Sequence, residues 1–223
     1  VITKGCQPTD GGFLIIEDKD LASFVSKEPL AKDYIRKFIG AKEFINNQNR
    51  WCLWLVDAKP SDLKKMPLVM ERVKGVRETR LKSSKAATRL KADTPTIFDE
   101  IRVSQGEYIL VPSVSSERRE YVPMGFMPPD VICSNLVFLI PDATLYHFGI
   151  LTSWPHMAWM RAVCGRLKSD YRYSKDIVYN NYPWPELSTE GTDAALRAAS
   201  ERTAQAILDA RARYPDSSLA DLY

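Results

Sequence analysis

The chain has 223 residues, of which 45% are hydrophobic and 26% charged, and its formal net charge is +3. These values are typical of soluble globular proteins, and the length suffices for one large core or two modest ones. The sequence has no apolar run of about 18 residues, so we expect no membrane-spanning helix. It begins at Val1 without a signal-peptide pattern, from which we expect a piece of a longer, cytoplasmic protein.

The cysteines argue against a metal site. Cys6, Cys52, Cys133 and Cys164 are far apart and form no Cys-x-x-Cys pair. With only two histidines besides, the residue clusters of a structural zinc site are missing. Cys52 and Cys133 lie in apolar runs, which favours reduced, buried thiols.

The N-terminal part predicts two strands on either side of a helix. The sequence GGFLIIED (11–18) begins with a glycine turn and predicts a strand. Apolar residues recur at helical spacing over 26–40, with Ser26 at the N-cap position and Gly40 at the C-cap position. The sequence RWCLWLVD (50–57) predicts a buried strand.

The next segment concentrates positive charge. Residues 59–91 contain eleven Lys and Arg against three Asp and Glu, and the apolar spacing predicts a helix over 61–91. Gly75 and the pair Ser83 and Ser84 are positions at which this helix is expected to be interrupted. Such a charge balance suits a polyanionic partner, but a solvated helix face has the same composition.

The rest of the chain alternates between short strands and helices. Extended runs punctuated by proline over 107–140 predict an antiparallel meander or open barrel. Residues 145–163 predict two helices, the second beginning at Pro155, and 176–185 predicts a last strand. An alanine-rich helical tail follows over 188–222. We therefore expect an α+β fold with a mixed, mostly antiparallel sheet of short strands, packed helices and a helical C-terminal extension.

Catalytic motifs are absent from the sequence. It contains no GxGxxG, no P-loop and no GxSxG. In NYPW (181–184), Tyr182 replaces the first proline of the Asn-Pro-Pro-aromatic tetrad of amino-methyltransferases, and no glycine-rich loop for S-adenosylmethionine precedes it. We therefore expect no enzyme activity and no bound cofactor in this chain.

Five ordered segments carry a resemblance to a known family: DGGFLI, RWCLWLVDA, VPSVSSERREYVPMGF, HMAWMRAVCGRLKSDYRYS and IVYNNYPWP. Together they resemble the target-recognition region of single-chain type IIG/IIL restriction–modification enzymes and adenine-N6 DNA methyltransferases. This resemblance implies a bacterial, non-catalytic specificity module that binds double-stranded DNA. It also implies a methyltransferase domain in the same polypeptide, in which S-adenosylmethionine binds.

The resemblance places the base-reading residues in GRLKSDYRYS (165–174). Lys168, Asp170 and Arg172 fall on positions that carry specificity in the family, and Leu136 falls near another. In an extended segment, Lys168 and Asp170 project from the same side, so they are suited to the guanine and cytosine of one base pair. A surface ion pair of Asp170 with Lys168 or Arg172 is the plainer alternative.

A second group of residues is assigned to the DNA backbone, which supplies affinity without sequence information. Helical spacing over 61–91 puts the first members of the group on one stripe, except for Arg77, which lies on the same predicted helix but off the stripe. The other members lie in the 113–120 segment or close to Lys168. For the 113–120 segment, a polar hairpin turn is an equal alternative. The group consists of Lys74, Arg77, Lys82, Lys85, Arg89, Ser115, Arg118, Arg119 and Arg166.

The sequence thus predicts a target-recognition domain over 1–187 and a truncated helical extension over 188–223. Two other classes of function stay open. Asp10, Glu17 and Lys19 imitate the acidic residue and Glu-x-Lys of metal-dependent nucleases, although their spacing is short for two strands. The basic stripe also suits a protein-interaction module with an acidic partner.

Overall fold

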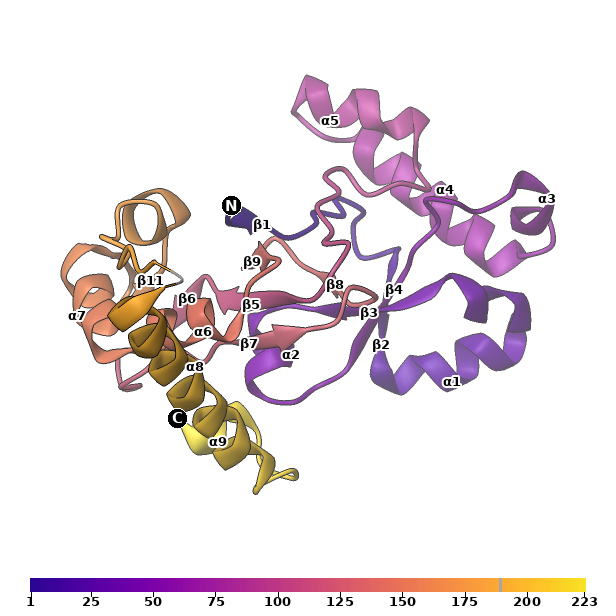
Figure 1. The fold of residues 1–223 in the computed structure, drawn as a ribbon. Helices are drawn as coiled ribbons and strands as arrows, with labels where there is room; N and C mark the ends of the chain where they lie inside the picture. Colours follow the sequence, from indigo (N-terminus) through magenta and orange to yellow (C-terminus); the bar gives the residue numbers. More distant parts are fainter. Residues whose placement is uncertain (189) are drawn as a thin grey trace.

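The computed structural model describes residues 1–188 and 190–223 and contains three small sheets surrounded by helices (Figure 1). Among the described strand pairs, only β3–β8 is parallel. In spatial order, the first sheet is β2 (Ile15–Glu17), β4 (Arg50–Leu53), β3 (Ile35–Ile39) and β8 (Ile132–Cys133). The second is β1 (Thr3–Lys4), β9 (Val137–Pro141), β5 (Tyr108–Pro112) and β7 (Gly125–Met127), and the third is β10 (Gly165–Leu167), β11 (Asp170–Arg172) and β6 (Val114–Ser115).

Helices account for most of the remaining regular structure, and the predicted α+β fold is confirmed. None of the described helices combines the length and apolar character that a membrane span requires. The α-helices are α1 (Asp18–Lys27), α2 (Ala41–Ile45), α3 (Pro60–Leu63), α4 (Pro67–Leu81), α5 (Ala86–Leu90), α6 (Leu145–Leu151), α7 (Trp154–Val163), α8 (Gly191–Ala212) and α9 (Leu219–Leu222). The other helical segments are the 3-10 turns η1 (Pro29–Tyr34) and η2 (Lys91–Asp93) and the π-helical η3 (Lys175–Tyr179).

Two hydrophobic cores divide the molecule. The first lies between the β2-β4-β3-β8 sheet and helices α1 and α4, where Val69, Val73 and Val76 are buried on the predicted apolar edge of α4. The second lies between the β1-β9-β5-β7 sheet and helices α6, α7 and α8. A smaller cluster that includes Ile39 and Leu110 joins the two sheets. The extended runs predicted over 107–140 supply strands to all three sheets.

The helix predicted over 26–40 is wrong. Pro29, which has no N–H to donate, begins the 3-10 turn η1, and residues 35–39 form β3 between β4 and β8. Gly40 begins α2, where its N–H donates to the Glu43 carboxylate, instead of ending a helix. Tertiary pairing on both edges of β3 therefore outweighs the local helical spacing.

The predicted flanking strands are confirmed in part, and the two predicted later helices are confirmed. The strand predicted after a glycine turn in 11–18 is confirmed for Ile15–Glu17: Gly11 and Gly12 have positive φ and form the turn, and α1 begins at Asp18. The strand predicted over 50–57 is confirmed for Arg50–Leu53, and the two helices over 145–163 are α6 and α7. Pro155 is in the first turn of α7, as expected.

The strand predicted over 176–185 is wrong. Its beginning is the π-helical turn η3, and its end is an irregular segment. Two indole N–H groups bind this backbone: Trp159 donates to the Val178 carbonyl at 2.9 Å and Trp184 to the Tyr179 carbonyl at 3.4 Å. Side-chain donors thus take the place of a neighbouring strand.

The helical tail packs on the second core. Along α8, Ala204 is buried in that core, and Ile207 and Leu208 pack against it. The helix approaches α6 so closely that a Cβ on Gly149 would lie 2.9 Å from the Ser200 hydroxyl oxygen. The division of the chain at residue 187 stays a prediction.

The basic segment is a broken helix held from within by Arg80. The break falls at 82–85, near the predicted serine pair, whereas Gly75 lies inside α4. The Arg80 side chain is 1% exposed, and burial lowers its pKa. All five of its N–H groups donate at 2.8–3.0 Å to backbone carbonyls, namely those of Pro8, Thr9, Lys91, Thr94 and Ile97. Arg80 therefore ties α4 to two otherwise irregular segments.

We predict that Arg80→Met lowers the free energy of unfolding by at least about 3 kcal/mol, because it leaves buried carbonyls without donors. Urea denaturation of both proteins measures the difference. Arg77→Met is the matched control, since Arg77 is exposed on the same helix, and its effect should stay within about 0.5 kcal/mol. Equal stability of the Arg80 and Arg77 variants would contradict the structural role.

Candidate nucleic-acid interface

The central stretch GRLKSDYRYS forms a tight hairpin. Strands β10 and β11 pair antiparallel, with Leu167 opposite Asp170, so only Lys168 and Ser169 form the turn. Lys168 has a φ of +56°, the left-handed conformation that the first residue of such a turn requires. The expectation of one extended segment across Lys168 and Asp170 is therefore wrong: the chain reverses between them, and both lie at the hairpin tip.

The hairpin is anchored on its β11 side. Strand β11 pairs with β6, where Tyr171 lies opposite Ser115. The next residue after β11, Tyr173, is 3% exposed, and its N–H donates to the Ser113 carbonyl at 2.9 Å. The Tyr173 hydroxyl lies 3.0 Å from Nε2 of His156, which α7 places in the second core. Tyr173 thus packs beneath the hairpin and Tyr171 is half-buried, whereas Lys168 and Arg172 remain exposed.

His156 is a buried, neutral histidine. Burial lowers its pKa to about 4, and its Nδ1 has no hydrogen-bond partner among the described residues. Its Nε2 contact with Tyr173 therefore links the hairpin to α7 through a group that is uncharged near neutral pH.

We predict that the protein loses about 1.6 kcal/mol of unfolding free energy between pH 6.5 and pH 5 through His156. In this window the unfolded chain, with an ordinary histidine pKa, binds a proton that the folded chain does not bind. Stability therefore falls as the pH falls, and this contribution levels off below the folded pKa of about 4. Urea denaturation at several pH values should show a smaller loss for His156→Gln, which cannot titrate. An identical pH dependence of the two proteins would refute this assignment.

The three predicted base-reading residues of the hairpin form no ion pair within the described chain. The Lys168 and Arg172 side chains are exposed. The Asp170 Oδ1 accepts a hydrogen bond from the backbone N–H of Glu117 at 3.4 Å. The surface ion pair that was the alternative interpretation is not formed. One carboxylate and one cationic group are therefore available at the tip, and Arg172 adds a second cationic group at the other end of the hairpin, opposite Gly165.

A cavity of about 670 Å³ lies beside the hairpin and brings Arg172 and Leu136 together. Leu136 is 59% exposed, and its carbonyl accepts hydrogen bonds from the backbone N–H and the hydroxyl of Ser113. Lys4 and Lys175 also line the cavity, together with Asp176, whose Oδ1 lies 3.6 Å from Nζ of Lys175, so with Arg172 its lining holds three cations and one carboxylate. Sequence reasoning missed these two lysines, because only the pairing of β1 with β9 and the turn η3 bring them to the hairpin.

The residues assigned to phosphate contacts fall into two separate groups. Lys74, Arg77, Lys82, Lys85 and Arg89 are exposed on α4, on α5 and at the break between them. This break means that they do not form the single stripe predicted for one helix. Nη1 of Arg89 donates to the carbonyls of Ser83 and Ser84, both at 2.9 Å, so Arg89 also closes the turn between the helices.

The second group surrounds the hairpin, and its members differ in their availability. Arg118 is exposed and Arg119 is half-buried on the loop that follows β6. Ser115 is 3% exposed, so its burial does not support a contact with DNA. Arg166 is engaged by its own hairpin: Nη1 donates to the Ser169 carbonyl at 2.7 Å.

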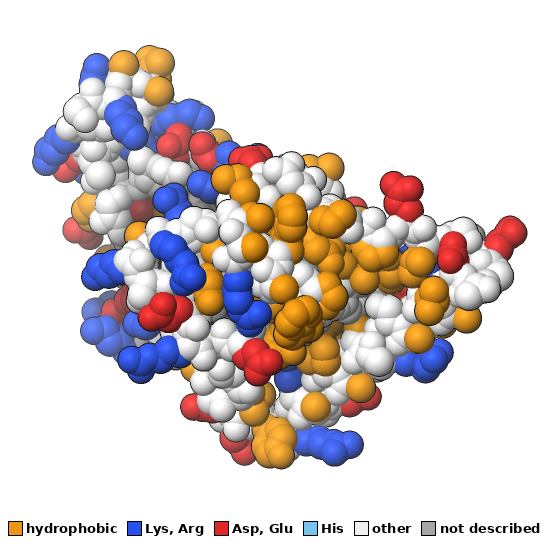
Figure 2. All heavy atoms as spheres, turned by 90° about the vertical axis from the view of Figure 1, so that its left-hand side faces the viewer, with side chains coloured by type: hydrophobic (Ala, Val, Ile, Leu, Met, Phe, Trp, Pro, Cys, Tyr) orange, Lys and Arg blue, Asp and Glu red, His pale blue; other side chains and the backbone are white. Residues whose placement is uncertain are grey.

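The surface around the hairpin is divided by side-chain type. Figure 2 shows the side of the molecule on which α7 and β11 lie. Most Lys and Arg side chains on this face lie along its left edge in the view, and hydrophobic side chains are grouped in its middle. A polyanion therefore meets positive charge on one edge of this face.

The residues of the nuclease alternative do not form a metal site. The Asp10 carboxylate is buried and accepts the backbone N–H of Leu14 at 2.6 Å, so it holds the glycine turn. No cluster of three His, Cys, Asp or Glu suited to a metal ion occurs in the described part of the chain. Glu17 and Lys19 line a surface hollow with Asn47, Gln48 and Asn49, and Asp10 does not line it.

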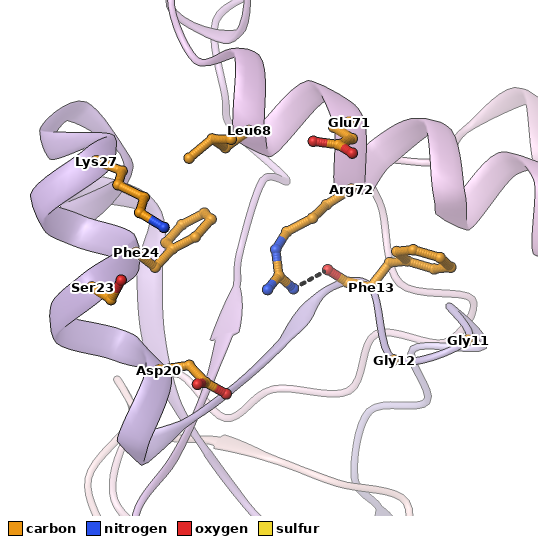
Figure 3. Close-up of a pocket in the computed structure, with 10 residues that line it drawn as sticks. All are labelled: Gly11, Gly12, Phe13, Asp20, Ser23, Phe24, Lys27, Leu68, Glu71 and Arg72. Atoms are coloured by element: carbon orange, nitrogen blue, oxygen red, sulfur yellow. Dashed lines mark hydrogen bonds between the residues drawn. The ribbon is translucent and has the colours of Figure 1, made fainter.

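A second pocket lies between α1 and α4, and its central side chain makes structural contacts (Figure 3). It has a volume of about 610 Å³, and Arg72 points into it from α4. The Arg72 guanidinium donates to the carbonyls of Phe13 and Ile15 at 2.8 and 3.1 Å and lies over the Phe24 ring. Arg72 therefore fixes β2 and α1 to α4, and neither Asp10, Glu17 nor Lys19 lines this pocket.

An anchored hairpin whose tip charges form no ion pair within the described residues, beside a cavity lined mainly by cations, suits a recognition domain. The comparisons with known proteins agree. Residues 1–186 match the family described as "MmeI, target recognition domain", and the chain belongs to this family.

Two solved structures and one curated protein give the extent of the likeness. The type IIL restriction–modification enzyme MmeI, solved in complex with DNA, matches 100% of this chain and 29% of that chain, with a TM-score of 0.94 and 45% identity. DNA methyltransferase A of Bacillus subtilis (strain 168) is 43% identical over 219 residues, which are 98% of this chain and 24% of that protein. The type IIG restriction endonuclease BpuSI matches 92% of this chain and 25% of its own with a TM-score of 0.56, but at 13% identity this likeness concerns the fold alone. The chain thus spans less than a third of these relatives.

Proposed function

We propose that this chain is a non-catalytic domain that reads the sequence of double-stranded DNA for a methyltransferase domain of the same polypeptide. The observation that carries the proposal is the β10–β11 hairpin, whose tip presents Lys168 and Asp170 with no ion pair in the described part of the chain, while Tyr173 anchors its base. The family membership and the relatives named as a DNA methyltransferase and as a restriction–modification enzyme support it.

The chemistry of the hairpin tip suits the major groove, which is wide enough for a two-stranded ribbon. The Lys168 ammonium donates to O6 and N7 of a guanine, and the Asp170 carboxylate accepts from N4 of a cytosine. Because Glu117 contacts only Oδ1 of Asp170, Oδ2 is available for the base. One good contact of this kind discriminates against a wrong base by about 1–3 kcal/mol.

Arg172 and Leu136 form a second reading position at the cavity. The Arg172 guanidinium has the planar set of donors that binds guanine in a bidentate manner. Leu136 supplies an apolar surface next to it, which suits the methyl group of thymine. Since both residues line one cavity, they contact the same or adjacent base pairs.

The cations of α4 and α5, together with Arg118 and Arg119, bind phosphates. They supply affinity that does not depend on sequence and help to offset the few kcal/mol that extruding the target adenine costs. S-adenosylmethionine binds in the methyltransferase domain of the same polypeptide, and the protein works in the bacterial cytoplasm. The chain itself binds no cofactor.

We predict that exchanging the two charges at the tip (Lys168→Asp with Asp170→Lys) changes one base pair of the methylated sequence and leaves methylation active. Aspartate tolerates the positive φ at position 168, so the turn is retained. Long-read sequencing of DNA methylated by the full-length protein measures the motif. The matched control exchanges Lys32 with Asp33, an exposed pair on η1. Methylation of an unchanged motif by the hairpin variant would sink the base-reading role.

We also predict that Lys82→Gln with Lys85→Gln weakens DNA binding equally for all sequences. If both side chains contact phosphates, the slope of log K against log salt falls by about 1.8. Fluorescence anisotropy at several salt concentrations measures this slope for the full-length protein. Lys19→Gln with Lys32→Gln removes two exposed charges elsewhere and serves as the control. An unchanged slope in the Lys82 and Lys85 variant would place the α4–α5 segment away from DNA.

A further inference from the structure

Arg166 makes several contacts within and beside the β10–β11 hairpin. The Arg166 guanidinium lies over the Tyr171 ring, 4.0 Å from its centroid, on the strand opposite. Nη1 of the same side chain donates to the Ser169 carbonyl at 2.7 Å, across the two-residue turn. Nη1 also lies 3.8 Å from Oε2 of Glu117, on the loop after β6.

Glu117 connects this arrangement to the reading residues. Its side chain pairs with Arg166, and its backbone N–H donates to Oδ1 of Asp170 at 3.4 Å. Glu117, on the loop after β6, therefore contacts both strands of the hairpin. It contacts the Arg166 guanidinium on β10 and, on β11, the Asp170 carboxylate proposed to accept from cytosine.

A phosphate-binding residue would present its donors to solvent. Nη1 of Arg166 instead donates to the carbonyl in the turn and lies near Glu117, and the guanidinium plane lies over the Tyr171 ring. Both Arg166 and Lys168 are exposed, the Arg166 side chain by 46%, but Arg166 has these partners whereas Lys168 forms no ion pair within the described chain.

We infer that Arg166 is a positioning residue that, with Tyr171 and Glu117, fixes the hairpin turn and the Asp170 carboxylate for base recognition, and is not a phosphate ligand. This inference rests on the proposed function and extends it. The Arg166 stack keeps the two strands in register, and its bond to the Ser169 carbonyl fixes the turn in which Lys168 adopts its positive φ.

The two roles differ in what a mutation changes. Loss of a phosphate contact weakens binding to all sequences alike and lowers the salt slope by about 0.9. Loss of a positioning contact instead lowers the ratio of affinities for the correct and the altered base pair, without changing the salt slope. Arg166→Lys keeps the charge but loses the planar stack, and Tyr171→Ala removes the stack without touching any charge.

The test uses the full-length protein and two duplexes, one with the sequence that the wild type methylates and one with the base pair assigned to Lys168 and Asp170 altered. We expect Arg166→Lys and Tyr171→Ala each to lower the affinity ratio about threefold to tenfold with an unchanged salt slope. Tyr171→Phe, which keeps the ring, should restore the ratio. Arg213→Lys, at an exposed position after α8, is the matched control for the arginine exchange.

Two results would overturn the inference. An unchanged affinity ratio in Arg166→Lys and Tyr171→Ala would show that the stack does not position the reading residues. In Arg166→Gln, a salt slope lowered by about 0.9 with an unchanged ratio would assign Arg166 to a phosphate. Failure of the proposed function is distinguished by the exchange of Lys168 and Asp170: if that exchange changes the motif while the Arg166 and Tyr171 variants do not affect the ratio, only the positioning role is wrong.

Discussion

The geometry of the interface depends on the burial of Tyr173. A hairpin whose strands have three residues each is not stable alone in water. Tyr173 fixes its base by placing a ring against Phe138 in the second core and a hydroxyl against His156. The backbone bond from Tyr173 to Ser113 continues the pairing of β11 with β6. The positions of the tip residues and of the cavity beside them follow from this single anchor.

Residues that are alike in sequence have opposite roles in the basic segment. Arg80 and Lys82 are two positions apart, yet Arg80 is buried with all five donors bound to carbonyls and Lys82 is exposed. Counting charges therefore overstates the surface that is available to a polyanion. Arg72 is also engaged within the fold, because its guanidinium donates to the carbonyls of Phe13 and Ile15. The positive face is built from the cations that the core does not use.

The sequence predicted the fold class and the elements whose signals are local, but it could not predict those set by tertiary pairing. Pro155 marks the start of α7 correctly, because a proline acts within the first turn of a helix. Residues 35–39 become a strand because β4 and β8 lie on both sides of them, which no window of sequence reveals. The resemblance assigned base reading to the stretch that forms the hairpin, and this stays a prediction; the turn at Lys168 was missed because lysine rarely adopts a positive φ. Glu117 was missed because its contact with Asp170 joins residues 53 positions apart.

The central claim is that the β10–β11 hairpin enters the major groove and contacts base edges. The most direct measurement is a structure of the full-length protein bound to a duplex that carries its methylated sequence. We predict the Lys168 Nζ and the Asp170 Oδ2 within about 3.2 Å of base-edge atoms of one G·C pair, with Arg166 still stacked on Tyr171. A complex in which the hairpin tip faces solvent, and another element occupies the major groove, would contradict the account.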